Sequence, residues 1–132
     1  MYFNPQTLID VLSDEAVAGQ AAVAIEADRK RITSPLAVVE AVLALSASGK
    51  SLEEAEALVT AFLDEKDIEV REMPPANKTV RLALAAVAEL DAADNDRATA
   101  SLHKAFADYY EVAAFSLSDA LAADAPDTNP EG

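Results

Sequence analysis

The stretch "RITSPLAVVEAVLALSASGKSLEEAEALVTAFLDEKDIEVREM" (residues 31–73) decides the fold. It opens with a short β-branched run, passes through two stretches with helical spacing of apolar residues, and closes on the alternating run "DIEVREM" at residues 67–73. The first helix begins sharply because Ser34 is a good N-cap and Pro35 a good first helical residue. The second begins at Ser51, where "SLEE" forms a capping box. We therefore expect a strand, two helices and a second strand.

The same alternation of elements continues toward both ends of the chain. Residues 1–4 predict a short strand, and the helix that follows has Asn4 as a plausible N-cap and Pro5 in its first turn. A second helix is expected before the basic turn "DRKR". On the other side, we expect a helix over residues 77–90, an acidic connection, and a last long helix whose apolar stripe includes Phe106.

The resulting order, β-α-α-β-α-α-β-α-α, predicts an α/β fold in which helices pack on a small parallel sheet. More helix than strand is expected because the chain is rich in alanine and has only 3 glycines among 132 residues. No internal repeat is visible. We expect one domain over residues 1–121, followed by a disordered acidic tail over residues 122–132, where Asp, Pro, Asn and Gly dominate.

Charge and composition exclude several classes of function. The net charge of −14 argues against an extended nucleic-acid surface, because binding to phosphates requires many Lys and Arg side chains. The chain has no cysteine, which excludes disulfides and thiolate metal sites. No apolar run reaches the roughly 18 residues of a membrane span, and the first residues do not resemble a signal peptide. We expect a soluble cytoplasmic protein.

Glu40 is the side chain that fits its surroundings least. Its neighbours one helical turn away on either side are all apolar, namely Leu36, Ala37, Leu43 and Ala44. Burial of a lone ionised carboxylate costs several kcal/mol unless the group is paired, protonated or bound to a metal. One interpretation is structural: Glu40 reaches water at the helix edge, or pairs with an Arg such as Arg81. The other is functional: Glu40 belongs to a carboxylate cluster that binds Mg²⁺ or Mn²⁺, which prefer oxygen ligands.

Residues 31–73 resemble the matching part of PIN domains, specifically the VapC-type toxins of bacterial toxin–antitoxin pairs. In that family a strand and an "SP" turn lead into a helix with an essential Glu, and a capped helix and an "IEV"-type strand follow. The resemblance implies a three-layer α/β/α fold with a small central parallel sheet. It also implies an Mg²⁺- or Mn²⁺-dependent endoribonuclease, a homodimer, and an antitoxin partner whose basic tail enters the acidic site.

Transferred residue by residue, the resemblance assigns an incomplete site. Asn4 stands where the family has its first Asp. Glu40 matches the second acid, and Asp108, in "ADYYEVA", is the nearest match to the third. The resemblance thus implies Glu40 and Asp108 as metal ligands and catalytic residues, with Asn4 in a degenerate position. Asp108 has an alternative role on the solvated side of its helix. The strand that carries the fourth acid in the family is not expected here, and no motif supports Asp119 or Asp124 in its place.

Three hypotheses for function follow. The first is a PIN-like protein with an eroded acidic site that acts by protein binding, with weak or no nuclease activity, because Asn4 lacks the charge of an Asp. The second is an active endoribonuclease that cleaves single-stranded RNA. The third is an unrelated α/β scaffold in which Glu40 forms a structural ion pair. His103, the only histidine, is expected to be a surface or hydrogen-bonded residue and not a catalytic base.

Overall fold

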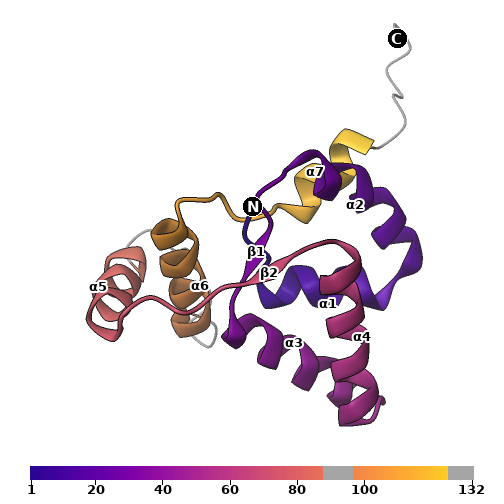
Figure 1. The fold of residues 1–132 in the computed structure, drawn as a ribbon, viewed down its shortest axis with the longest axis horizontal. Helices are drawn as coiled ribbons and strands as arrows, with labels where there is room; N and C mark the ends of the chain where they lie inside the picture. The colour runs from indigo at the N-terminus through magenta and orange to yellow at the C-terminus, as the bar shows by residue number, and fades with distance from the viewer. Residues whose placement is uncertain (88–96, 125–132) are drawn as a thin grey trace, which may run out of the picture.

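The computed structural model describes residues 1–87 and 97–124, and they form a small parallel sheet surrounded by helices (Figure 1). The two strands are β1 (Ile32–Thr33) and β2 (Glu69–Val70). The helices are α1 (Pro5–Ser13), α2 (Glu15–Ala27), α3 (Pro35–Ala47), α4 (Leu52–Glu65), α5 (Ala76–Val87), α6 (Arg97–Tyr110) and α7 (Leu117–Asp124). The predicted helix-rich α/β fold with a small parallel sheet is confirmed.

The sheet is wider than its two strands. β1 pairs with β2 in parallel, with Ile32 opposite Glu69. Tyr2 adds parallel bridges to Ile32 on one side and to Ala114 on the other. Across the sheet the order is therefore Ala114, Tyr2, β1 and β2. The chain thus returns to the sheet after α6, where no strand was expected, although it pairs there through a single residue.

That last pairing is short because a helix begins close behind it. The Phe115 N–H donates to the Tyr2 carbonyl at 2.8 Å, and the Tyr2 N–H donates to the Ala113 carbonyl at 2.9 Å. Directly after this contact, the Ser116 Oγ accepts from the Asp119 N–H at the start of α7. A run this brief shows no alternation that a strand prediction can use.

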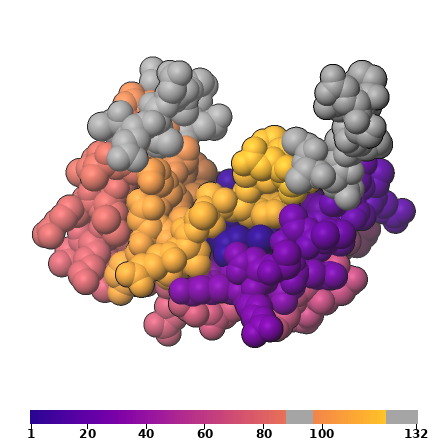
Figure 2. Space-filling model, turned by 90° about the horizontal axis from the view of Figure 1, so that it is seen from above, coloured from indigo at the N-terminus to yellow at the C-terminus, as the bar shows by residue number. Residues whose placement is uncertain are grey.

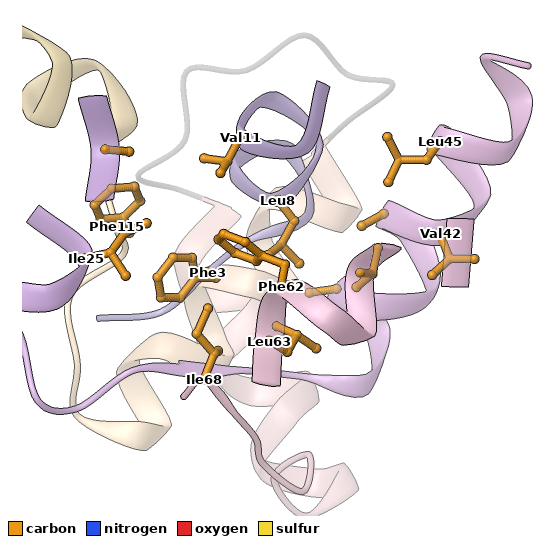
Figure 3. Packing of buried hydrophobic residues seen from close by; sticks show 14 of the residues in the cluster. Phe3, Leu8, Val11, Ile25, Val42, Leu45, Phe62, Leu63, Ile68 and Phe115 are labelled. Atoms are coloured by element: carbon orange, nitrogen blue, oxygen red, sulfur yellow. The ribbon is translucent and has the colours of Figure 1, made fainter. Parts of the chain in front are cut away.

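The side chains of Tyr2 and Phe3 point to opposite faces of the sheet, as neighbours in an extended segment do. Phe3 enters the larger core cluster with residues of α1 to α4, and its ring stacks on Phe115 at 5.3 Å between centroids (Figure 3). Tyr2 enters the smaller cluster with Ile32, Phe106 and residues of the C-terminal part of α6. The sheet therefore has apolar packing on both faces.

The helices lie on opposite sides of the strands. α5 and α6 pack together on one side, and α1 to α4 with α7 lie on the other (Figure 1). Seen from above, the salmon and orange helices α5 and α6 form one mass and the indigo-to-magenta N-terminal half another, with the yellow C-terminal segment between them (Figure 2). Tyr2 and Ile32 on the sheet and Phe106 on α6 provide the apolar contact between the two parts.

The predicted helix starts are confirmed by the caps. The Asn4, Ser34 and Ser51 side chains each accept a backbone N–H at the start of their helices. Gly49, just past α3, has a φ of 122°, a conformation that glycine adopts without steric cost. In the part of the chain that the structure describes, no helix combines the length and the apolar character that crossing a membrane requires.

Boundaries differ at three places. The strand predicted over residues 1–4 pairs with the sheet only through Tyr2. The run "DIEVREM" contributes only Glu69–Val70 as a strand, and the chain then leaves the sheet toward α5. α7 continues to Asp124, past the expected start of the tail at residue 122. Three predicted features lie outside the described residues. They are the end of the helix predicted over residues 77–90, the acidic connection after it, and the remainder of the tail.

Candidate functional site

A cavity of about 770 Å³ opens between α6 and the helices α1 and α3, where Tyr2, which pairs in the sheet, leads through Asn4 into α1. Ligand sites in open parallel α/β sheets lie at the carboxyl ends of the strands. Asn4, Glu40 and Asp108, the three residues predicted for the site, all line this cavity. Apolar side chains complete its wall, among them Ile9, Ala44, Ala100, Ala107 and Val112.

Glu40 is partly buried, and its partner is His103 from α6. The Glu40 carboxylate lies 2.9 Å from His103 Nε2, and the exposed fractions of the two side chains are 28% and 6%. The sequence pattern correctly predicted that Glu40 needs compensation, but the partner is not Arg81, which lies exposed on α5. This contact joins α3 to α6 across the cavity.

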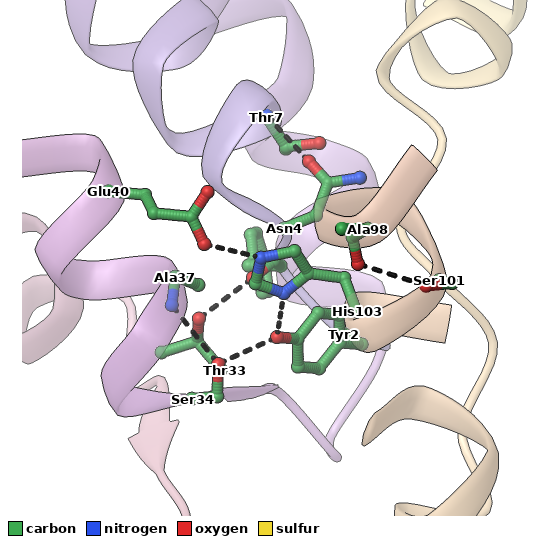
Figure 4. Close-up of polar contacts among 11 residues, drawn as sticks. Tyr2, Asn4, Thr7, Thr33, Ser34, Ala37, Glu40, Ala98, Ser101 and His103 are labelled. Carbon is green, nitrogen blue, oxygen red and sulfur yellow. Dashed lines mark hydrogen bonds and ion pairs between the residues drawn. The ribbon is translucent and has the colours of Figure 1, made fainter. Parts of the chain in front are cut away.

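His103 belongs to a chain of buried hydrogen bonds (Figure 4). Its Nδ1 lies 2.6 Å from the Tyr2 hydroxyl, which lies 2.8 Å from Ser34 Oγ. Ser34 Oγ in turn accepts the Ala37 N–H at 3.1 Å. Because Ser34 is also the N-cap of α3, this chain links the start of that helix to the Glu40 carboxylate nearly two turns further on.

The chemistry of these groups assigns the direction of every proton in the chain. Burial lowers the pKa of His103 below its ordinary value, against the opposing effect of Glu40, so the ring is neutral at pH 7. An ionised carboxylate only accepts, so Nε2 carries the proton that is donated to Glu40 and Nδ1 accepts. The Tyr2 hydroxyl then donates to Nδ1 and accepts from the Ser34 hydroxyl. Burial also raises the pKa of Tyr2, which keeps its phenol protonated.

Asn4 lines the cavity in the role of a helix cap. Its Oδ1 accepts the Thr7 N–H at 2.8 Å, at the start of α1. The predicted cap is therefore present, and the same residue stands at the cavity wall. An amide at this place provides hydrogen-bonding atoms but no charge.

Asp108 lies at the mouth of the cavity, one helical turn after Lys104. Its carboxylate is 3.1 Å from Lys104 Nζ, and about half of its side chain is exposed. Asp108 therefore lines the cavity and also lies on the solvated side of α6, and its implied role as a metal ligand stays a prediction. Asp119 is exposed on α7. Within residues 1–87 and 97–124, no group of three or more His, Asp or Glu side chains is arranged to hold a metal ion.

Tyr2, Ser34 and His103 are the site residues that sequence reasoning did not assign. Ser34 was predicted as a cap and His103 as a surface or hydrogen-bonded residue. The hydrogen bond between Tyr2 and His103, which completes their link, spans 101 residues of sequence. One signal was present: a partly buried carboxylate requires a nearby donor, and His103 lies on the same helical stripe as Phe106. Comparison of the chain with protein-family models, curated proteins and solved structures finds no match.

Proposed function

We propose that this chain is a PIN-like domain, similar to the VapC-type toxins, that acts by binding a protein partner and has weak or no nuclease activity. The partner inserts a basic side chain of an extended segment into the cavity, as the antitoxins of that family do. Glu40 receives the cation, and the apolar wall of the cavity packs against the stem of the inserted side chain.

The arrangement of the elements supports the family assignment. Parallel pairings run in the order Ala114, Tyr2, β1, β2, and apolar clusters lie on both faces of the sheet. This is consistent with the three-layer α/β/α fold that the resemblance implies. The cavity lies where the chain passes from Tyr2 in the sheet to α1, next to Asn4, which stands where that family has its first acid.

The contact between Glu40 and His103 is the observation that carries the proposal for function. It holds the carboxylate in place through a neutral donor, so the charge of Glu40 is not cancelled. The carboxylate remains partly exposed at the cavity. A carboxylate that is held by a neutral donor in a concave and partly apolar site favours a cationic ligand, and the net charge of −14 increases the rate of encounter.

The same contacts fit a divalent metal poorly. One Glu40 oxygen accepts from His103, Asp108 pairs with Lys104, and Asn4 provides no charge. Hard cations bind through several oxygen ligands, and the number of charged ligands determines much of their affinity. The proposed function therefore involves no metal ion.

A binding titration tests the proposal. The probe is acetyl-Ala-Arg-Ala-amide (the arginine peptide), and its control is the same peptide with citrulline, which is nearly isosteric and uncharged. We expect the arginine peptide to shift NMR signals of residues around the cavity at pH 7.5. Glu40→Gln should weaken binding by at least about tenfold, since it removes one partner of a charge pair. Glu53→Gln removes the same charge at an exposed position of α4 and should leave binding unchanged. Equal binding of the citrulline peptide would overturn the proposal.

An active endoribonuclease remains the second candidate, because Asn4, Glu40 and Asp108 share one cavity. Thermal stability in Mn²⁺ or Mg²⁺ separates the two, since a metal that binds only the native state raises the melting temperature. We expect no stabilisation of the wild-type protein at micromolar Mn²⁺ and no cleavage of single-stranded RNA. Stabilisation that appears in Asn4→Asp supports a lost metal site, whereas RNA cleavage by the wild-type protein establishes the second candidate.

We also propose a cytoplasmic homodimer, as the resemblance implies. Exposed apolar side chains support self-association: Val39 and Leu43 lie one turn apart on α3, and Val80 and Leu84 lie one turn apart on α5. All four are more than half exposed, so each helix presents a pair of large aliphatic side chains to solvent. Light scattering of the wild-type protein and of Leu43→Glu measures the molecular mass that distinguishes dimer from monomer.

A further inference from the structure

The sheet ends on one side at Ala114, and the backbone of this residue has an open side. The Tyr2 N–H donates to the Ala113 carbonyl, and the Phe115 N–H donates to the Tyr2 carbonyl. Because the backbone groups of successive strand residues point to opposite sides, the N–H and the carbonyl of Ala114 face away from Tyr2. Among the described residues, neither of these two groups has a hydrogen-bond partner, and Ala114 is exposed. The sheet therefore has an open edge at Ala114.

This open edge lies at the cavity that contains Glu40. Residues 112–114 line the cavity wall, and the segment after α6 that carries them lies at the surface between the two parts of the molecule (Figure 2). Bridge partners in a sheet point their side chains to the same face, so the Ala114 side chain shares the face of Tyr2. That face leads to Glu40, because the Tyr2 hydroxyl contacts His103 and His103 contacts Glu40. A strand added at Ala114 would therefore present a side chain on the cavity face.

We propose that the extended segment of the protein partner pairs with this edge as an added antiparallel strand. The inference rests on the proposed function of the cavity and defines how the partner binds there. One residue of the partner donates its N–H to the Ala114 carbonyl and accepts the Ala114 N–H, as a hydrogen-bonded pair in an antiparallel sheet does. The side chain of that residue points to the cavity face and is the basic side chain that Glu40 receives. Main-chain bonds then add affinity, and the cavity adds specificity.

The opposite edge of the sheet, at Val70 in β2, is less suited to an added strand. The Glu69 and Arg71 N–H groups donate toward β1, so the backbone groups of Val70 also face outward. However, the side chains of Glu69 and Arg71 form an ion pair at this edge, and Pro74 follows soon after. Charged side chains and prolines protect an edge from pairing. Residues 112–115, "VAAF", contain neither, so the edge at Ala114 is the one that accepts a strand.

An NMR titration at pH 7.5 with a longer probe tests the added strand. The probe is acetyl-Thr-Val-Arg-Val-Thr-amide (the five-residue peptide), whose β-branched residues favour an extended chain. N-methylation of its arginine removes the N–H that should bond to the Ala114 carbonyl. N-methylation of the valine after the arginine removes an N–H that should face away from the edge, and it is the matched control. The first change should weaken binding by about two- to tenfold, as the loss of one main-chain hydrogen bond does, and the second should leave binding unaltered. Equal effects of the two changes would overturn the inference.

Variants of the protein test the same pairing from the other side. Ala114→Pro removes an N–H that the sheet does not use, and proline is tolerated on a sheet edge where its nitrogen faces solvent. Val70→Pro makes the same change at the opposite edge and is the matched control. Ala114→Pro should weaken binding of the five-residue peptide by about two- to tenfold, and Val70→Pro should leave it unchanged. Wild-type affinity in Ala114→Pro would contradict the added strand.

Hydrogen exchange of the wild-type protein covers the case in which Ala114→Pro does not fold. Saturating five-residue peptide should slow exchange of the Ala114 amide and leave exchange of the Val70 amide unchanged, since only the first amide gains a hydrogen bond. Unchanged exchange at Ala114 would overturn the inference. Slow exchange at Ala114 without peptide, lost on dilution of the protein, would also overturn it, because a second copy of the chain would then occupy the edge.

The outcomes separate the added strand from the function of the cavity. If the arginine peptide binds through Glu40 but the Ala114 amide and both N-methylated peptides show no effect, only the added strand fails. If neither the arginine peptide nor the five-residue peptide binds, the proposed function fails as well.

Discussion

At the scale of single residues, the site is explained by the need to satisfy buried polar groups. Glu40 is placed by the pattern of α3 in apolar surroundings, and His103 provides the donor that it requires. His103 then needs a donor of its own at Nδ1, which Tyr2 provides, and Ser34 satisfies Tyr2. Each group is buried because the next one is present, so loss of one member should affect the others.

Tyr2→Phe should destabilise the protein more than the equivalent change at Tyr110. Removal of the Tyr2 hydroxyl leaves the buried Nδ1 of His103 without a donor, which costs about 1–3 kcal/mol. The Tyr110 hydroxyl donates to the carbonyl of Glu72, an exposed residue, so its loss should cost only about 0.5–1.5 kcal/mol. Urea unfolding measures both. Equal losses of stability would contradict the hydrogen-bond chain.

His103 should also make stability depend on pH. Burial lowers its pKa in the folded protein, so the unfolded chain binds more protons in the range just below pH 6.5. Stability is therefore fully present above about pH 6.5 and falls below it, by up to about 1.4 kcal/mol per pH unit. The free energy of unfolding of wild type minus that of His103→Gln, measured between pH 7.5 and 5.5, isolates this effect. This difference should decrease as the pH falls, and an increase would contradict the expectation.

Only part of the residue-scale picture could be predicted from sequence. The apolar neighbours of Glu40 showed that its charge needed compensation, because that is a local property of one helix. The identity of the partner depends on which helix packs across the cavity, and His103 is 63 residues away. The role of Asn4 as a helix cap was predictable from its neighbours in sequence. Only the resemblance predicted that Asn4 shares a site with Glu40 and Asp108.

At the scale of elements, caps were more predictable than strands. Ser34 followed by Pro35, and the "SLEE" box at Ser51, act within one turn of helix, so the residues that decide the helix start are neighbours in sequence. β2 and the bridge at Ala114 are stabilised by pairing with distant segments. The length of each pairing is determined by where the chain leaves the sheet. The alternation of apolar residues in the sequence does not predict that point.

Ser34→Ala tests the double role of that cap. The loss of a helix N-cap alone costs about 1 kcal/mol. The Ser34 hydroxyl also donates a buried hydrogen bond to the Tyr2 hydroxyl. The substitution should therefore cost about 2 kcal/mol or more in total. Ser51→Ala removes an exposed cap with no second partner of this kind and is the matched control, with an expected cost of about 1 kcal/mol. Equal costs in thermal unfolding would show that Ser34 acts only as a cap.

At the scale of the whole molecule, the cavity lies between two separately packed parts. α1 and α3 belong to the part with the larger core, while α6 carries His103 and Asp108 and contacts the sheet through the smaller cluster (Figure 1). The geometry of the site therefore depends on how firmly α6 is held. Phe106, fully buried between α6 and the sheet, is the largest apolar side chain that α6 contributes to this contact.

Phe106→Ala should loosen α5 and α6 before the remainder of the molecule. The lost burial and the cavity left behind cost about 3–5 kcal/mol, and the effect falls on the smaller cluster. Hydrogen exchange should accelerate in α5 and α6 more than in α1 to α4. Phe62→Ala, in the larger core cluster, is the control and should accelerate exchange in α1 to α4. Uniform acceleration in both variants would show that the two parts unfold as one unit.

The site depends on a neutral His103 that donates a hydrogen bond from Nε2–H to Glu40 and accepts one from Tyr2 at Nδ1. A ¹⁵N NMR spectrum of the histidine ring at pH 7.5 tests this directly, because the chain has a single histidine and the shifts of the two ring nitrogens identify the protonated one. The account predicts a protonated Nε2 and an unprotonated Nδ1. A proton on Nδ1 alone, or on both nitrogens at that pH, would contradict it.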